Sequence, residues 1–219
     1  IIKLLESYNI SEDVIGLVFD TTATNTGRHS GVNTRLNQNL NKEVLHLACR
    51  HHVFECHIKN ISKLFKITSG PEKILFKTLA DSFDAIKFTK SDLKRFIFKQ
   101  NDQLDLTAKA SLDAINRILV QGNLPRGDYY ELAQFVRFYL SETGYDDFNL
   151  KQPGAFHHAR FLSQAIYYLK LEILSNVTNI ASTAPLKKEV KEMSEFIALF
   201  YARWFLMSSH SVVSPRMDL

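Results

Sequence analysis

The sequence predicts a short α/β segment followed by a mainly helical remainder, so that helix predominates overall. Apolar runs of strand length occur only within the first fifty residues. From about residue 53 onward, apolar residues recur at helical spacing instead. The chain is 45% hydrophobic and contains sixteen Phe and eight Tyr, which is enough large apolar surface for packed cores. We therefore expect two folded parts, a partial α/β domain over residues 1–66 and a helical domain over residues 67–219.

The strand prediction rests on residues 14–19 (VIGLVF) and residues 44–48 (VLHLA). Continuous apolar runs of this length are typical of strands that are buried on both faces of a parallel sheet. A complete α/β sheet has more than two strands. We therefore expect the remaining strands to lie outside these 219 residues.

The helix prediction follows the apolar spacing and the residues that begin and end helices. Phe54, Ile58, Ile61 and Phe65 share one helical face. Asp128 and Glu131 have the spacing of a capping box, which opens a helix. Further helices are expected over residues 74–86, 91–98, 112–121, 128–140, 156–175 and 185–207.

Composition narrows the classes of partner. Two cysteines without a CxxC pair do not form a disulfide framework, and no apolar run is long enough to span a bilayer. The net charge is +4, and residues 59–109 hold eleven basic and six acidic residues. This local excess is compatible with a polyanionic partner such as nucleic acid. Taken alone, the charge favours a set of solvated helix faces.

Asp20 is the sharpest local feature, because it directly follows the first apolar run. A carboxylate just beyond the carboxyl end of a buried strand is a common position for metal or substrate contact in α/β folds. Mg²⁺ prefers such oxygen ligands and usually takes only one or two from protein. The alternative is that Asp20 caps the following turn by bonding to its own backbone.

Cys49 and His52 follow the second apolar run, with Cys56 and His57 close behind. A Cys and a His three residues apart have the spacing of half a zinc site. All four candidate ligands lie within nine residues, however, unlike the separated ligand pairs of structural zinc sites. The alternative for Cys49 is a small buried residue at a strand end.

His157 and Arg160 are a third candidate, because residues three apart on a helix share a face and both side chains could touch phosphate. The alternative is a polar first turn of a helix. The sequence contains no GxGxxG, Walker A, HExxH or GxSxG motif.

Residues 4–27 (LLESYNISEDVIGLVFDTTATNTG) resemble hAT-type DNA transposases around their second catalytic aspartate. In that family a strand ends in D-x-x-A-x-N, which Asp20, Ala23 and Asn25 match. A C/D-x-x-H motif follows at the end of the next strand, and Cys49 and His52 match it. The resemblance covers residues 1 to about 66. Beyond them, the helical remainder resembles the family's long helical insertion, where Arg160 with the following Phe is similar to a common Arg-Trp pair.

The resemblance implies an RNase H-like catalytic domain that is interrupted by the helical insertion. It implies DNA cleavage and strand transfer with paired Mg²⁺ or Mn²⁺ ions, in the nucleus, by a protein that can form homo-oligomers. Asp20 would be a catalytic metal ligand, and His52 would lie beside the scissile phosphate. Asn25, Cys49 and Arg160 would support the motifs. The basic residues expected to contact the DNA backbone are Arg50, Lys59, Lys63 and Lys66.

The chain also departs from the family pattern. The family's first catalytic aspartate precedes the matched segment and its catalytic glutamate follows the insertion, and neither has a match here. Glu172, Glu192 and Glu195 are not assigned that role. One carboxylate cannot hold two metal ions, so we expect this chain by itself to be inactive. The alternatives are a domesticated, non-catalytic module that binds DNA or protein, and an unrelated helical scaffold in which Asp20 and His52 lie far apart.

Overall fold

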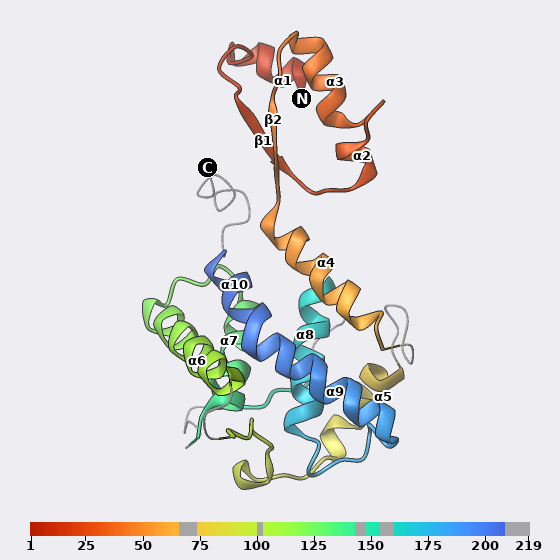
Figure 1. Cartoon of the computed structure of the whole chain (residues 1–219), viewed down its shortest axis with the longest axis vertical. Helices are drawn as coiled ribbons and strands as arrows, with labels where there is room; N and C mark the ends of the chain where they lie inside the picture. Colours follow the sequence, from red (N-terminus) through yellow and green to blue (C-terminus); the bar gives the residue numbers. More distant parts are fainter. Residues whose placement is uncertain (66–73, 100–102, 143–147, 154–159, 209–219) are drawn as a thin grey trace. The chain divides into compact units, whose positions relative to one another are not determined.

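The computed structural model describes residues 1–65, 74–99, 103–142, 148–153 and 160–208 (Figure 1). The chain forms two compact units. The first comprises Ile1–Cys56 with Ser208, and the second comprises His57–Met207. The sequence prediction had placed a boundary after residue 66. The described residues are predominantly helical, which confirms that part of the predicted fold class.

The first unit contains the sheet that the apolar runs predicted. Its elements are α1 (Ile2–Ser7), β1 (Gly16–Phe19), α2 (Ala23–Thr26), α3 (Val32–Leu40), β2 (Leu45–Ala48) and the start of α4 (Arg50–Ser62). The two strands are parallel, and the register runs from Gly16 opposite Leu45 to Phe19 opposite Ala48. Helices α2 and α3 pack against each other and lie on one side of the strands (Figure 1).

The expectation that these strands are buried on both faces is wrong for the described residues. All four residues of β1 are partly exposed, and Leu45 at the start of β2 is 51% exposed. Ile15, whose carbonyl accepts a hydrogen bond from Leu45, is 80% exposed. The physical reason is the width of the sheet. Among the described residues each strand has only one neighbour, and α2 and α3 are too short to cover both faces.

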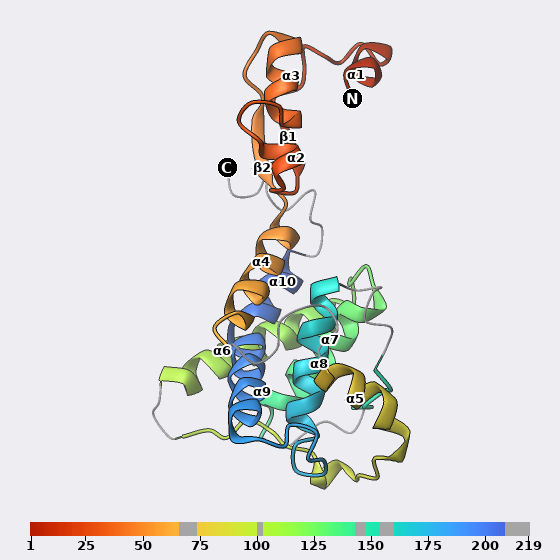
Figure 2. The ribbon, with the colours of Figure 1, turned by 90° about the vertical axis from the view of Figure 1, so that its right-hand side faces the viewer.

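The second unit is a bundle of helices (Figure 2), and the residues buried between them are mostly apolar. The helices are α5 (Ile74–Ser82), α6 (Gln103–Gln121), α7 (Gly127–Leu140), α8 (Arg160–Ile173), α9 (Ala184–Phe196) and α10 (Ala202–Met207). A π-helical turn over Ile197–Tyr201 joins α9 to α10 without a break. Helix α6 packs on α7, α7 on α8, α8 on α9, and α10 on both α6 and α7. Among the helices described, none is both long and apolar enough to cross a membrane.

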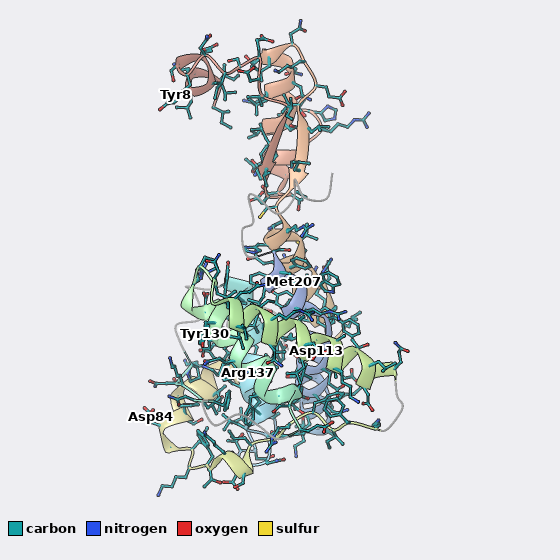
Figure 3. All side chains as sticks on the ribbon, turned by 90° about the vertical axis from the view of Figure 1, so that its left-hand side faces the viewer. Tyr8, Asp84, Asp113, Tyr130, Arg137 and Met207 are labelled. Carbon is teal, nitrogen blue, oxygen red and sulfur yellow. The ribbon has the colours of Figure 1, made fainter. Side chains whose placement is uncertain are left out.

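Helix α7 illustrates how this bundle uses amphipathic helices. Tyr129 is buried at 6% exposure, whereas the next residue, Tyr130, is labelled in Figure 3 and is 44% exposed. Successive helical residues point about 100° apart, so one faces the core and the other faces solvent. The core-facing side is continued by Leu132, Phe135, Val136 and Tyr139.

The helix predicted over residues 91–98 is not formed. The chain makes one 3₁₀ turn over Lys90–Asp92 and then runs without helical structure through residue 99. Its backbone bonds to distant segments instead. The amide of Lys94 donates to the carbonyl of Ile173, and the amide of Phe96 donates to the carbonyl of Tyr139, each at 2.8 Å. These contacts with α7 and α8 satisfy the backbone groups that a local helix would otherwise have paired.

The predicted capping box of α7 is also not formed. Arg126 is the N-cap residue, and no side-chain bond caps the helix. Asp128 instead pairs with Arg126, and Glu131 pairs with the buried Lys170 of α8 at 2.9 Å. Burial lowers the pKa of Lys170, whereas the nearby Glu131 carboxylate raises it, with a net downward shift. Glu131 therefore contributes to packing between helices rather than to the start of its own helix.

Candidate functional site

The carboxyl ends of the two strands bring together the residues that the sequence singled out. Asp20 directly follows β1 and Cys49 directly follows β2. Because the strands are parallel and pair Phe19 with Ala48, both residues lie at the same edge of the sheet. The amide of Cys49 donates to the carbonyl of Phe19 at 3.0 Å, which extends the pairing up to the site. Both side chains are partly buried.

The Asp20 carboxylate is held through one of its two oxygens. Oδ1 accepts hydrogen bonds from the Thr22 amide at 2.9 Å, the Thr22 hydroxyl at 2.6 Å and the Asn25 side-chain amide at 2.8 Å. The contact with the Thr22 amide is the turn-capping role that the sequence left open as an alternative. Oδ2 accepts no hydrogen bond from the part of the chain that is described. Turn capping and cation binding are therefore compatible, because they use different oxygens.

Asp20 is also held in its charged form. The Thr22 hydroxyl, then the Thr22 amide, and to a smaller extent Asn25, lower the pKa of Asp20 by hydrogen bonding to the carboxylate. Desolvation opposes them, and the charge of His52 lowers the pKa further.

His52 lies in the first turn of α4, and that helix orients its ring. Nδ1 is 3.8 Å from Oε2 of Glu55, and Nε2 is 3.7 Å from the sulfur of Cys56. The three residues share one helix face because they are three and four positions apart. The His52 side chain is 25% exposed.

The zinc hypothesis requires Cys49 and His52 to share a metal ion with Cys56 or His57. Both cysteines are free, and Cys56 contacts His52 on its own helix. Within the described ranges, no three side chains of His, Cys, Asp or Glu gather closely enough to hold a metal ion.

Two glycines allow the loop after Asp20 to fold tightly, and sequence reasoning missed their role. The amide of Gly31 donates to the carbonyl of Gly27 at 2.8 Å. A Cβ atom at Gly31 would lie 2.5 Å from the backbone nitrogen of Gly27, 2.6 Å from the carbonyl oxygen of Gly27 and 2.9 Å from the carbonyl oxygen of Asn25. The sequence has no phosphate-binding motif here, and these glycines serve close backbone packing. The signal that could have revealed them is their four-residue spacing in the segment between the first strand and α3.

The predicted DNA-backbone residues have different surroundings. Arg50 donates to the Ser208 hydroxyl at 3.0 Å within the first unit. Lys59 and Lys63 belong to the second unit and are exposed, and Lys63 donates to the Asn60 side chain at 3.3 Å. Lys66 lies outside the described residues.

The third candidate pair is described only in part. Arg160 is the first residue of α8, but its side chain is not among those described. His157 lies outside the described residues.

Comparison with known proteins adds no family to this geometry. No family model, no curated protein and no solved structure matches the chain.

Proposed function

We propose that this chain is part of a hAT-like, transposon-derived protein that acts on DNA in the nucleus. In this proposal the first unit is a portion of an RNase H-like catalytic domain, and the second unit is the helical insertion. The observation that supports it most strongly is the parallel strand pair, whose carboxyl ends present Asp20 and, through the start of α4, His52. The amide of Cys49 pairs with the carbonyl of Phe19 at this edge, and His52 follows three residues later in α4.

The Asp20 carboxylate fits one contact to Mg²⁺ or Mn²⁺. It is held ionised, it is oriented by Thr22 and Asn25, and its Oδ2 has no hydrogen-bond partner in the described structure. A hard divalent cation takes one or two protein carboxylates and completes its shell with water and phosphate oxygens. When bound, the cation would supply positive charge to a phosphate. His52 would contribute a hydrogen-bond donor to that phosphate by exchanging one of its two present contacts, to Glu55 or to Cys56, for a phosphate oxygen.

The resemblance that motivates this proposal implies two further carboxylates, and neither has a match in this sequence. The proposed role of the chain by itself is therefore to bind a cation and DNA, rather than to cleave DNA. This defines the test: binding of the cation at Asp20 is measurable without catalysis.

The test is paramagnetic line broadening by Mn²⁺ in nuclear magnetic resonance spectra of the 219-residue chain. At substoichiometric Mn²⁺, we expect the amide signals of Thr21, Thr22 and Cys49 to broaden first. The variant Asp20→Asn should lose this broadening. Because an asparagine side chain still offers an oxygen to Thr22, the turn should keep its conformation.

Asp92→Asn is the matched control. Asp92 is also an aspartate whose pKa is lowered by hydrogen bonds from a threonine, Thr89, but it caps a 3₁₀ turn in the second unit. We expect this variant to keep the Mn²⁺ broadening around Thr22. Broadening that persists unchanged in Asp20→Asn would disprove a metal-binding role for Asp20.

A DNA-binding measurement distinguishes a fragment of a metal-dependent transposase from a domesticated, non-catalytic DNA-binding module. Fluorescence anisotropy with duplex DNA should give an affinity that falls as salt rises from 50 to 200 mM, as counterion release requires. If Asp20 and a cation bridge to a phosphate, Mg²⁺ should strengthen binding by the wild type and not by Asp20→Asn. Binding that ignores both Mg²⁺ and this substitution would instead favour the non-catalytic module.

A further inference from the structure

A cavity in the second unit is lined by residues that the proposed site at the strand ends does not use. Its volume is about 380 Å³, and it is formed by the carboxyl end of α8, the first turns of α9 and Lys94. Four lysines line it: Lys94, Lys187, Lys188 and Lys191. Two acids, Glu172 and Glu192, also line it. The cavity therefore has an excess of positive charge.

Three of these lysines already have an acidic partner. Lys94 is 2.8 Å from buried Glu172, and Lys188 is 3.7 Å from Glu192. Lys191 is 3.1 Å from Glu195, which is not part of the cavity lining.

Lys187 is different, because its side chain has no acidic or hydrogen-bonding partner among the described residues. It lies four residues before Lys191 on α9, so the two ammonium groups share a helix face. Like charges in this arrangement repel and weaken the helix unless an anion lies between them. Lys187 is therefore the cation that most clearly lacks a counter-charge in this cavity.

The remaining polar lining suits an oxyanion. Ser175 and Thr178 add two partly buried hydroxyl groups at the end of α8. Ammonium and hydroxyl donors around one space are the groups that bind phosphate oxygens. The amide of Asn176 is already used, because it donates to the carbonyl of Asp92 at 3.3 Å.

We propose that this cavity binds a phosphate group, with Lys187 as the principal cation and Lys191 as its neighbour. The proposal goes beyond the function suggested for the strand ends, because it needs neither Asp20 nor a metal ion. Two sources share this chemistry: a phosphate of a nucleic-acid backbone and a small free phosphate compound. The experiment has one arm for each.

Inorganic pyrophosphate and a short DNA duplex are titrated separately into the 219-residue chain, and amide shifts of residues 175–192 report on the cavity. For whichever probe binds, Lys187→Gln should raise the dissociation constant about ten-fold or more. This is the effect expected from losing one charge-assisted hydrogen bond. Glu192→Gln should strengthen it, because Lys188 loses its acidic partner. Lys77→Gln removes another exposed lysine, in α5, that does not line the cavity, and it should leave probe binding unchanged.

The outcomes are distinct. Shifts with pyrophosphate alone identify a small phosphate ligand, and shifts with both probes identify a backbone phosphate. The absence of shifts with either probe, or equal effects of Lys187→Gln and Lys77→Gln, would overturn the proposal. Asp20→Asn should leave these titrations unchanged, so failure of the metal proposal would not be mistaken for failure of this one.

Discussion

Gly31→Ala tests whether close backbone packing holds the loop that positions Asn25 beside Asp20. Gly31 has φ −64° and ψ 158°, a conformation that alanine adopts without strain. The cost of the substitution is therefore steric. The added Cβ would meet three backbone atoms at 2.5, 2.6 and 2.9 Å, and backbone cannot move aside as a flexible side chain can. Overpacking of this kind costs about 1–3 kcal/mol.

Hydrogen exchange at the strand pair measures this cost within the first unit. If opening of the unit becomes easier by about 1–3 kcal/mol, protected amides should exchange about 5- to 150-fold faster. The most informative amides are those of Leu45 and Cys49, which donate to Ile15 and Phe19 at the two ends of the pairing. The Asn25 side-chain signals should also shift as the loop moves.

Gly127→Ala is the matched control, because a Cβ at Gly127 would meet nothing within 4 Å. Gly127 is the first residue of α7, where alanine is expected to be neutral or to stabilise by about 0.4–1 kcal/mol. Unchanged exchange in Gly31→Ala would refute the packing argument. Equal acceleration in both variants would show that the effect is not specific to the loop.

Two further predictions concern single hydrogen bonds. Ser111 donates from α6 to the carbonyl of Ala198 at 2.6 Å in the buried π-helical turn, so Ser111→Ala should destabilise the second unit by about 1–3 kcal/mol in thermal or urea unfolding. Ser82→Ala loses an exposed bond of the same length and should cost less than about 0.5 kcal/mol; equal costs would contradict the role of burial. The pKa of Asp20 lies below 3.8, so its share of stability is complete above that pH and is lost as pH falls through the folded-state pKa. Thr22→Val removes the largest cause of this shift and should raise the carboxyl titration midpoint measured by nuclear magnetic resonance, whereas an unchanged midpoint would contradict the assignment.

Local patterns in the sequence were sufficient to identify most elements. The apolar runs predicted both strands, and helical periodicity predicted α4, α5 and the long segment over α9 and α10. The prediction that Pro185 begins a helix is confirmed to within one residue, because α9 starts at Ala184. The Thr183 hydroxyl caps that helix by accepting from the Leu186 amide. These features depend on residues close in sequence, which is why pattern reasoning reaches them.

The sequence predicted the positions of the candidate site residues in the elements, but not which of them lie close together. The sequence placed Asp20 and Cys49 after their strands, but the parallel pairing and register decide that both meet at one edge of the sheet. The tight approach of Gly31 to Gly27 likewise depends on how α2 packs against α3. The hydrogen bonds to Asp20 are local by comparison, because they come from Thr22 and from Asn25 in α2.

Two local predictions are wrong because residues distant in sequence supply the hydrogen-bond and ion-pair partners. The predicted helix over residues 91–98 does not form, because the amides of Lys94 and Phe96 donate to the carbonyls of Ile173 and Tyr139. The predicted capping box does not form, because Glu131 pairs with the buried ammonium of Lys170. A buried polar group without a partner costs more than a local propensity gains, so the fold satisfies such groups first. The sequence thus determined most of the elements and the chemistry available at their ends. Packing over long range decided which of those groups became neighbours.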